Sequence, residues 1–162
     1  MKKFLFLYCL LLMLGISQNS LLADNDRDEK KAEFVRLQVD SCRFKIDVST
    51  ANPVGGRTVM LSSGYSLELK GDSVFSFLPY YGRAYNIPYG GGDGLRFNTS
   101  IKDFNKRIKK HKYILSFTAV TKEDTFHFFV TIFDNGRANI SLTMQNRSSI
   151  SFSGEMDATE LQ

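Results

Sequence analysis

The feature that most constrains this fold is a regular alternation, broken only by Phe129, of apolar and polar residues on both sides of an Asp-Asn-Gly turn. Every second residue is apolar over 126–132 and again over 138–144, which predicts two β-strands with one buried face each. A two-residue turn at Asn135 and Gly136 would set apolar residues opposite polar ones. We therefore predict a three-residue loop, Asp134 to Gly136, with a left-handed glycine. It pairs Ile132 with Ala138, Val130 with Ile140, Phe128 with Leu142 and Phe126 with Met144.

The same period of two predicts strands elsewhere in the chain. Phe44 opens a strand that ends at Asn52-Pro53, and a later strand covers residues 113–120. A short strand is expected near 95–97, and a last one around 150–152. All of these stretches are separated by turn residues, which favours antiparallel neighbours with short connections.

Two further hairpins are expected between residues 59 and 78. One uses a three-residue loop over 62–64, and the other a two-residue turn at Gly71-Asp72, which suits a primed turn. The first pairs Leu61 with Tyr65 and Val59 with Leu67, and the second pairs Leu69 with Val74 and Tyr65 with Leu78. In this arrangement Val59, Leu61, Tyr65, Leu67, Leu69 and Val74 share one face.

These stretches predict a mainly β fold: seven to nine antiparallel strands in a meander, as a curled barrel or a two-layer sandwich, with a short N-terminal helix. The helix is expected in the charged residues 24–40, whose end is ambiguous because apolar residues at 35, 37 and 39 also alternate as in a strand. A single β domain is expected over 41–156, followed by a polar tail, 157–162, because 162 residues are too few for two ordinary cores.

Residues 1–23 have the layout of a signal peptide, with two lysines before an apolar run over 4–16. Small residues offer cleavage after Ser17 or after Ala23, and both sites remain open. The run is shorter than the roughly 20 residues of a membrane span. Because Cys9 lies inside the run, a lipoprotein is not expected. We expect an exported protein without a transmembrane segment, in the periplasm or cell envelope or secreted.

The clearest charge asymmetry is the stretch 102–112, where six basic residues face one acid in a chain of net charge +4. We interpret it mainly as a solvated turn. The alternative is an anion site for a glycan or for lipopolysaccharide phosphates. Nucleic acid is not an expected partner of an exported protein, and no base-stacking pattern accompanies the lysines. The candidate anion-binding residues are Lys106, Arg107, Lys109 and Lys110.

A Gly- and Tyr-rich segment, 78–94, interrupts the strands, because its prolines and glycines prevent a continuous strand or helix. Its aromatic and basic side chains are candidates for stacking on a sugar, a peptide or another flat ligand. The structural interpretation, that glycines permit turns while tyrosines cap the core, is favoured for loop tyrosines in general. The candidate ligand-binding residues are Tyr80, Tyr81, Arg83, Tyr85 and Tyr89.

Catalytic and metal sites have little support in the sequence. Cys42, His111 and His127 lack ligand spacing, so no metal or cofactor is expected. The residues from Asp24 imitate a calcium loop but have Glu29 where glycine is needed. Both histidines are interpreted as strand or surface residues, and Cys42 as a small core residue. Asp72, Asp124 and Asp134 are placed at turns, and no catalytic residue is identified.

A series of short motifs resembles a known family. The motifs are Ala51-Asn52-Pro53, Gly55-Gly56-Arg57, Ser63-Gly64-Tyr65-Ser66-Leu67, Leu78-Pro79-Tyr80, Gly82-Arg83-Ala84-Tyr85 and Pro88-Tyr89-Gly90-Gly91. In this order and spacing they resemble domain-of-unknown-function family 4251, exported proteins of Bacteroidetes, over roughly residues 40 to 155. The resemblance implies a bacterial cell-envelope location and carries over no catalytic or binding residue.

The leading hypothesis is an exported, non-enzymatic binding module that uses the segment 78–94, with an envelope glycan, peptide or lipid as partner. The alternatives are an enzyme acting on envelope polymers through an unidentified acid pair, and a structural or assembly module. A tyrosine-lined cavity would favour binding, and a deep site with two close carboxylates would favour the enzyme. A filled core with closed loops would favour the structural module.

Overall fold

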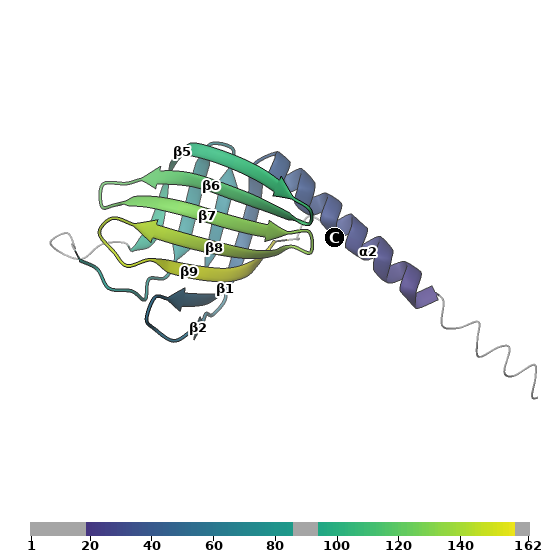
Figure 1. The fold of residues 1–162 in the computed structure, drawn as a ribbon, viewed down its shortest axis with the longest axis horizontal. Coiled ribbons are helices and arrows are strands. Elements are labelled where there is room, and N and C mark those ends of the chain that lie inside the picture. Colours follow the sequence, from purple (N-terminus) through teal and green to yellow (C-terminus); the bar gives the residue numbers. More distant parts are fainter. Residues whose placement is uncertain (1–18, 86–93, 158–162) are drawn as a thin grey trace, which may run out of the picture.

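The computed structural model describes residues 19–85 and 94–157. Within them, one helix precedes nine strands (Figure 1). The elements are α2 (Asn19–Asp40), β1 (Arg43–Pro53), β2 (Val59–Met60), β3 (Ser66–Lys70), β4 (Ser73–Leu78), β5 (Leu95–Lys109), β6 (Lys112–Val120), β7 (Thr125–Phe133), β8 (Arg137–Met144) and β9 (Ile150–Met156). The mainly β fold with an N-terminal helix is confirmed.

The strands form a closed barrel rather than a sandwich. Neighbours follow the order β1-β3-β4-β5-β6-β7-β8-β9, and β9 pairs back with β1, so that eight antiparallel strands close the sheet. β2 pairs only with the end of β1. A bulge between Val48 and Thr50 interrupts the β1–β9 register and helps β1 to bend. Closure leaves no edge strand among these eight, although it does not pair every strand along its full length.

Side chains fill the inside of the barrel, as expected for eight strands. Phenylalanine rings stack there, with centroids 4.5 Å apart for Phe97 and Phe126 and 4.8 Å apart for Phe117 and Phe128. The largest fully buried side chains are Phe126, Phe128, Phe152, Ile46, Leu67, Leu69, Leu78, Leu95, Leu115, Ile132, Ile140 and Leu142. The core therefore consists of the alternating residues of almost every strand.

Two of the predicted hairpin registers are confirmed. β7 and β8 pair Ile132 with Ala138 and Phe126 with Met144, around a loop in which Gly136 is left-handed with φ of 81°. β3 and β4 pair Leu69 with Val74 across the Gly71-Asp72 turn, and the same register continues toward Tyr65. In both hairpins a glycine occupies a backbone conformation that other residues adopt at a cost.

The predicted hairpin over 62–64 is wrong. β2 and β3 do not pair with each other; both lie on the same edge of β1, with Ala51 opposite Val59 and Asp47 opposite Ser66. The chain between them bulges away from β1. The same residues face the core in a bulged strand and in a hairpin, so the alternation alone did not distinguish the two structures. The prediction that these residues share one inward face is confirmed in part, since Val59, Leu61 and Tyr65 are partly buried and pack against the core.

The basic stretch is mostly strand. The strand expected near 95–97 is therefore longer than predicted, and the interpretation of 102–112 as a solvated turn is wrong for most of its length. β5 continues to Lys109, and only Lys110 and His111 connect it to β6. Beyond Lys102 both faces of β5 are largely exposed, so the strand lacks the alternation that would have predicted it. A bulge at Asp103, where φ is 55°, shifts the register with β6 by one residue.

Helix α2 runs to Asp40, so the ambiguous residues near 35–39 are helical. Its last turns bury Val35 and Val39 at one end of the barrel, while its N-terminal part extends away from the sheet (Figure 1). Cys42, expected in the core, is only partly buried; it follows the helix with a left-handed φ of 53°. In the part of the chain that the structure describes, no helix combines the length and apolar character needed to cross a membrane.

Candidate functional site

The two ends of the barrel carry different segments (Figure 1). The helix end holds the last turns of α2 together with the β5–β6 and β7–β8 turns. The opposite end, here named the loop end, holds residues 79–85 and 94, the β6–β7 turn and the β8–β9 loop. The candidate ligand-binding residues lie at the loop end, and the candidate anion-binding residues lie at the helix end.

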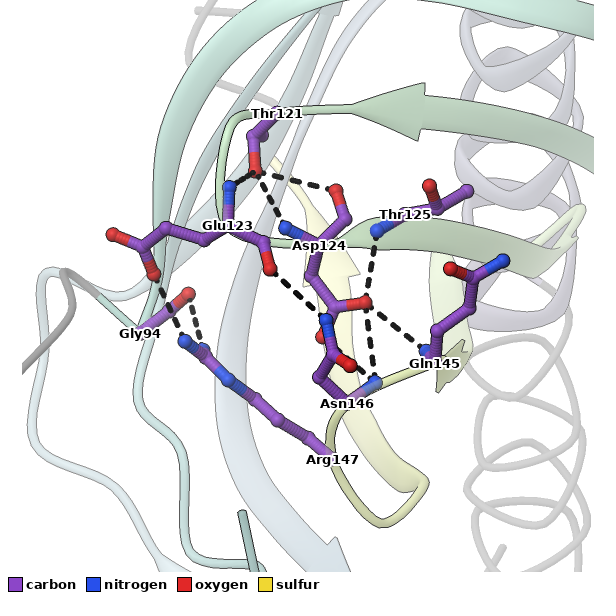
Figure 2. Close-up of polar contacts among 8 residues, drawn as sticks. All are labelled: Gly94, Thr121, Glu123, Asp124, Thr125, Gln145, Asn146 and Arg147. Carbon is purple, nitrogen blue, oxygen red and sulfur yellow. Dashed lines mark hydrogen bonds and ion pairs between the residues drawn. The ribbon is translucent and has the colours of Figure 1, made fainter. Parts of the chain in front are cut away.

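A buried carboxylate ties two segments of the loop end together (Figure 2). Asp124 accepts hydrogen bonds from the backbone N–H groups of Thr125 at 2.8 Å, Gln145 at 3.0 Å and Asn146 at 3.3 Å. The Thr121 hydroxyl accepts from the backbone N–H of Asp124 at 3.2 Å. Asp124 lies at a turn, as its sequence position indicated, and its carboxylate oxygens accept hydrogen bonds from backbone N–H groups. It is therefore a structural acceptor that joins the β6–β7 turn to the β8–β9 loop.

Arg147 is the second polar anchor of the loop end, and the sequence did not indicate it. Its guanidinium donates to the carbonyl oxygen of Gly94 at 2.7 Å and to Glu123 Oε2 at 2.9 Å (Figure 2). The guanidinium also lies 5.7 Å from the Tyr80 ring centroid, and the Arg147 side chain is only 5% exposed. A buried arginine requires such partners, because an unpaired charge away from water is strongly destabilising.

Tyr80 fastens the Tyr-rich segment to the β8–β9 loop. Its hydroxyl donates toward the carbonyl oxygens of Arg83 at 2.8 Å and Ser148 at 3.0 Å. Ser148 reciprocates, since its N–H donates to the Arg83 carbonyl at 2.9 Å and its Oγ accepts from the Arg83 N–H at 3.0 Å. An isolated bridge joins Ala84 to Arg147, and the Tyr85 N–H donates to the Asn146 carbonyl at 2.8 Å. The backbone of residues 80–85 is thereby held in place.

The structure divides the five candidate ligand-binding residues. Tyr80 is partly buried against the core, which is the structural role considered for loop tyrosines. Tyr81 and Tyr85 are 45% and 72% exposed, and Arg83 is exposed between them in sequence. Tyr89 lies outside the described residues, as do residues 86–93 in general. Three side chains thus project from a fastened backbone, two of them aromatic and one cationic.

The candidate anion-binding residues lie on β5 and its turn. Lys106 donates to Asp40 Oδ1 of α2 at 2.7 Å, which ties the strand to the end of the helix. Arg107, Lys109 and Lys110 are exposed and form no ion pair within the described chain. Lys106 therefore has a structural partner, while the other three are available to the surroundings.

The two histidines lie apart on the molecule. His127 is on the outer surface of β7, with Nδ1 3.1 Å from Thr118 Oγ1 of β6. His111 is in the β5–β6 turn, with Nδ1 3.0 Å from Asp134 Oδ2. Over residues 19–85 and 94–157, no three His, Cys, Asp or Glu side chains are grouped closely enough to hold a metal ion.

An eight-stranded antiparallel barrel with a helix at one end is the structural class of this chain. The model of the family described as domain of unknown function (DUF4251) matches residues 26–156, so the chain belongs to that family, and the resemblance seen in its motifs is confirmed. The chain is also similar to a crystal structure of a DUF4251 family protein from Bacteroides eggerthii, with a TM-score of 0.62 and 14% identity. The similarity covers 82% of this chain and 90% of that one and supports the fold. No curated protein matches the sequence.

Proposed function

We propose that this protein is a non-enzymatic binding module of the bacterial cell envelope, and that Tyr81, Arg83 and Tyr85 hold its ligand. The observation that carries the proposal is the exposure of these side chains on a backbone fastened to the β8–β9 loop by Tyr80 and Ser148. Side chains displayed by an ordered backbone bind with a smaller loss of entropy than those of a free loop.

The side chains suit an envelope glycan that bears an anionic group. Tyrosine rings provide flat apolar area with a polar tip, so they stack on sugar rings while remaining hydrated. Tyrosine also loses little rotamer freedom on binding. The Arg83 guanidinium forms paired hydrogen bonds with a carboxylate or phosphate. A peptide or a lipid would use the aromatic stacking and the Arg83 hydrogen bonds less fully than such a glycan. Both are therefore included in the binding experiment.

The envelope location is part of the proposal and rests on the apolar run and small residues of 1–23. We expect fractionated protein to begin at Gln18 or Asp24, as read by N-terminal sequencing. An intact Met1 in the purified protein would contradict export through a cleaved signal peptide.

Binding is tested by thermal shift against envelope glycans, peptidoglycan fragments, lipids and peptides, followed by calorimetry for any ligand found. Substitutions Tyr81→Ala, Arg83→Ala and Tyr85→Ala should each weaken the affinity about five- to tenfold, the effect of losing roughly 1 kcal/mol of contact. Phe129→Ala is the matched control, because Phe129 is also an exposed aromatic residue, 52% accessible, but lies on the outer wall of β7.

The proposal is contradicted if the affinity of a ligand is unchanged in all three variants while they remain folded. A structural or assembly module is the second candidate, and the filled barrel interior favours it. In that case no ligand would shift the wild-type protein. The enzyme alternative lacks a comparable observation, because Asp124 binds backbone N–H groups and Glu123 pairs with Arg147.

A further inference from the structure

The β5–β6 turn and the adjoining half of β5, residues 102–112, form a surface here named the basic hairpin. From 95 to 100, β5 pairs with β4, and the Ile101 N–H still donates to the Asp72 carbonyl at 2.7 Å. Beyond that residue, β6 is the strand with which β5 pairs. The far half of β5 therefore has a free edge, beside the end of α2. This half of β5 is exposed on both faces, whereas Tyr113 and Leu115 of the neighbouring strand β6 are buried.

The charges of this hairpin are largely uncompensated. Asp103 is the one acid within the hairpin, against six basic residues. The acids that adjoin the hairpin already have partners, since Asp40 binds Lys106 at 2.7 Å and Asp134 lies 3.0 Å from His111. The remaining basic side chains form no ion pair with any residue that the structure describes. They are Lys102, Arg107, Lys109, Lys110 and Lys112.

An apolar side chain projects from the middle of these charges. Ile108 lies opposite Tyr113, one residue before the turn lysines, yet it is 61% exposed. On the other face, Lys109 lies opposite Lys112, and Lys112 opposite Phe133 of β7. Phe133 and the residues from Lys109 to Lys112 line an open hollow of about 490 Å³. Lysine stems form apolar walls there while their ammonium groups reach the rim.

Protection of the free edge explains only part of this arrangement. Lysines on an exposed edge strand hinder pairing with another chain. An exposed isoleucine at the tip acts against that purpose, because it adds β-propensity and apolar surface at the edge. An apolar residue surrounded by cations instead suits a surface that is anionic outside and apolar just beneath.

We propose that the basic hairpin docks the protein on an anionic lipid bilayer, with the lysine ammonium groups on lipid phosphates and Ile108 inserted below the headgroups. Docking there would leave the loop end, at the opposite side of the barrel, directed away from the membrane. The proposal does not depend on what the loop end binds, so the two can fail separately.

The test is cosedimentation with vesicles of phosphatidylcholine, with and without phosphatidylglycerol. All variants are purified after export from the same host, so that they share one N-terminus. Binding should require phosphatidylglycerol and should weaken in high salt. Lys109→Gln with Lys110→Gln should lower the partition coefficient about 30-fold, since each lysine near an anionic surface contributes roughly fivefold. Ile108→Ser should lower it about fivefold with the charge unchanged.

The matched control is Arg57→Gln with Lys122→Gln, which removes two exposed charges outside the hairpin and should change binding less than about twofold. Thermal unfolding by circular dichroism verifies the fold of each variant. If the first pair unfolds, Arg107→Gln with Lys112→Gln replaces it with the same expectation.

Three results would overturn the proposal. One is equal binding to vesicles with and without phosphatidylglycerol. Another is an equal loss in the control variant, which would indicate a nonspecific effect of net charge. The third is lysine-dependent binding that Ile108→Ser leaves unchanged and that a soluble polyanion removes, because that would assign the hairpin to soluble anionic polymers.

Discussion

The two ends of the barrel use their polar residues in opposite ways. At the loop end, Asp124 and Arg147 are buried. Asp124 binds backbone N–H groups, and Arg147 binds the Gly94 carbonyl and the Glu123 carboxylate. At the helix end, Lys106 binds Asp40, but Lys102, Lys109 and Lys110 of the basic hairpin are exposed and form no ion pair within the described chain. Polar side chains mainly maintain the fold at the loop end, whereas most basic side chains of the hairpin at the helix end are left for external partners.

The difference follows from what each end must connect. Three irregular segments meet at the loop end, and their backbone N–H and C=O groups need partners that no strand supplies. Asp124, Arg147 and Tyr80 provide these partners. At the helix end the turns are tight and the helix covers the core, so few side chains are required for closure. The following predictions test this division, beginning with the largest expected effect.

Asp124→Ala should destabilise the protein most, by about 3 kcal/mol or more, because three backbone N–H groups lose a charged acceptor. Urea unfolding followed by circular dichroism measures the change. Asp134→Ala is the control at the helix end, where the carboxylate is more exposed and should contribute less than about 1 kcal/mol. Equal losses in the two variants would contradict the division between the ends.

Gly136→Val tests whether the helix end also contains a backbone position that disfavours β-branched residues. It should cost about 2 kcal/mol, because φ is 81° and an added Cβ would lie 3.0 Å from Lys31 Cε. Gly136→Asn should cost less, since asparagine tolerates the left-handed region. Chemical unfolding of both variants gives the comparison, and an unchanged midpoint in Gly136→Val would reject the left-handed turn.

Tyr80→Phe removes only the hydroxyl that fastens residues 80–85. We expect a loss of about 1 to 2 kcal/mol, because the carbonyl oxygens of Arg83 and Ser148 lose a donor. Tyr85→Phe should change stability by less than about 0.5 kcal/mol, since that ring is exposed. If Tyr80→Phe leaves stability unchanged but abolishes ligand binding, Tyr80 belongs to the binding residues rather than to their support.

The smallest effect concerns alkaline pH at the helix end. Burial, and then the charges of Asp134 and Asp40, raise the pKa of Tyr113 above its usual value near 10. The folded protein then retains a proton that the unfolded chain loses, so stability is full below about pH 10 and falls as pH rises through the folded pKa.

Tyr113→Phe should flatten this decline by an amount below about 1 kcal/mol, measured by urea unfolding at pH values on either side of 10. The pKa of Lys45 is raised in the same direction, chiefly by its hydrogen bond to Asp47, so part of the slope should remain in this variant. An identical decline in wild type and Tyr113→Phe would show that Tyr113 does not contribute.

Much of the secondary structure could be predicted because it depends on local chemistry. Alternation predicted β6 to β9, and the three-residue loop at Gly136 followed from the need to keep both apolar faces inward. The turns at Asp124 and Asp134 followed from aspartate preferences. For the binding residues, the sequence indicated an exposed aromatic segment but did not indicate that Tyr80 would differ from Tyr81 and Tyr85.

The candidate site was less accessible to prediction because its contacts join distant segments. Arg147 lies in a polar run with no local signal, and its partners Gly94 and Glu123 are 53 and 24 residues away in the chain. Asp124 had a local role at its turn, but its bonds to Gln145 and Asn146 required knowledge of which loops adjoin. The extent of β5 was also hidden, because a strand exposed on both faces lacks periodicity.

By itself, therefore, the sequence determined that this chain forms antiparallel strands with specified inner faces, since a period of two residues and a few turn glycines suffice for that. Tertiary structure alone decided that β9 meets β1 to close a barrel, that β2 and β3 share one edge of β1, and that Arg147 lies buried at the loop end. These features depend on which edges and loops come together in space, and residue spacing along the chain does not encode that choice.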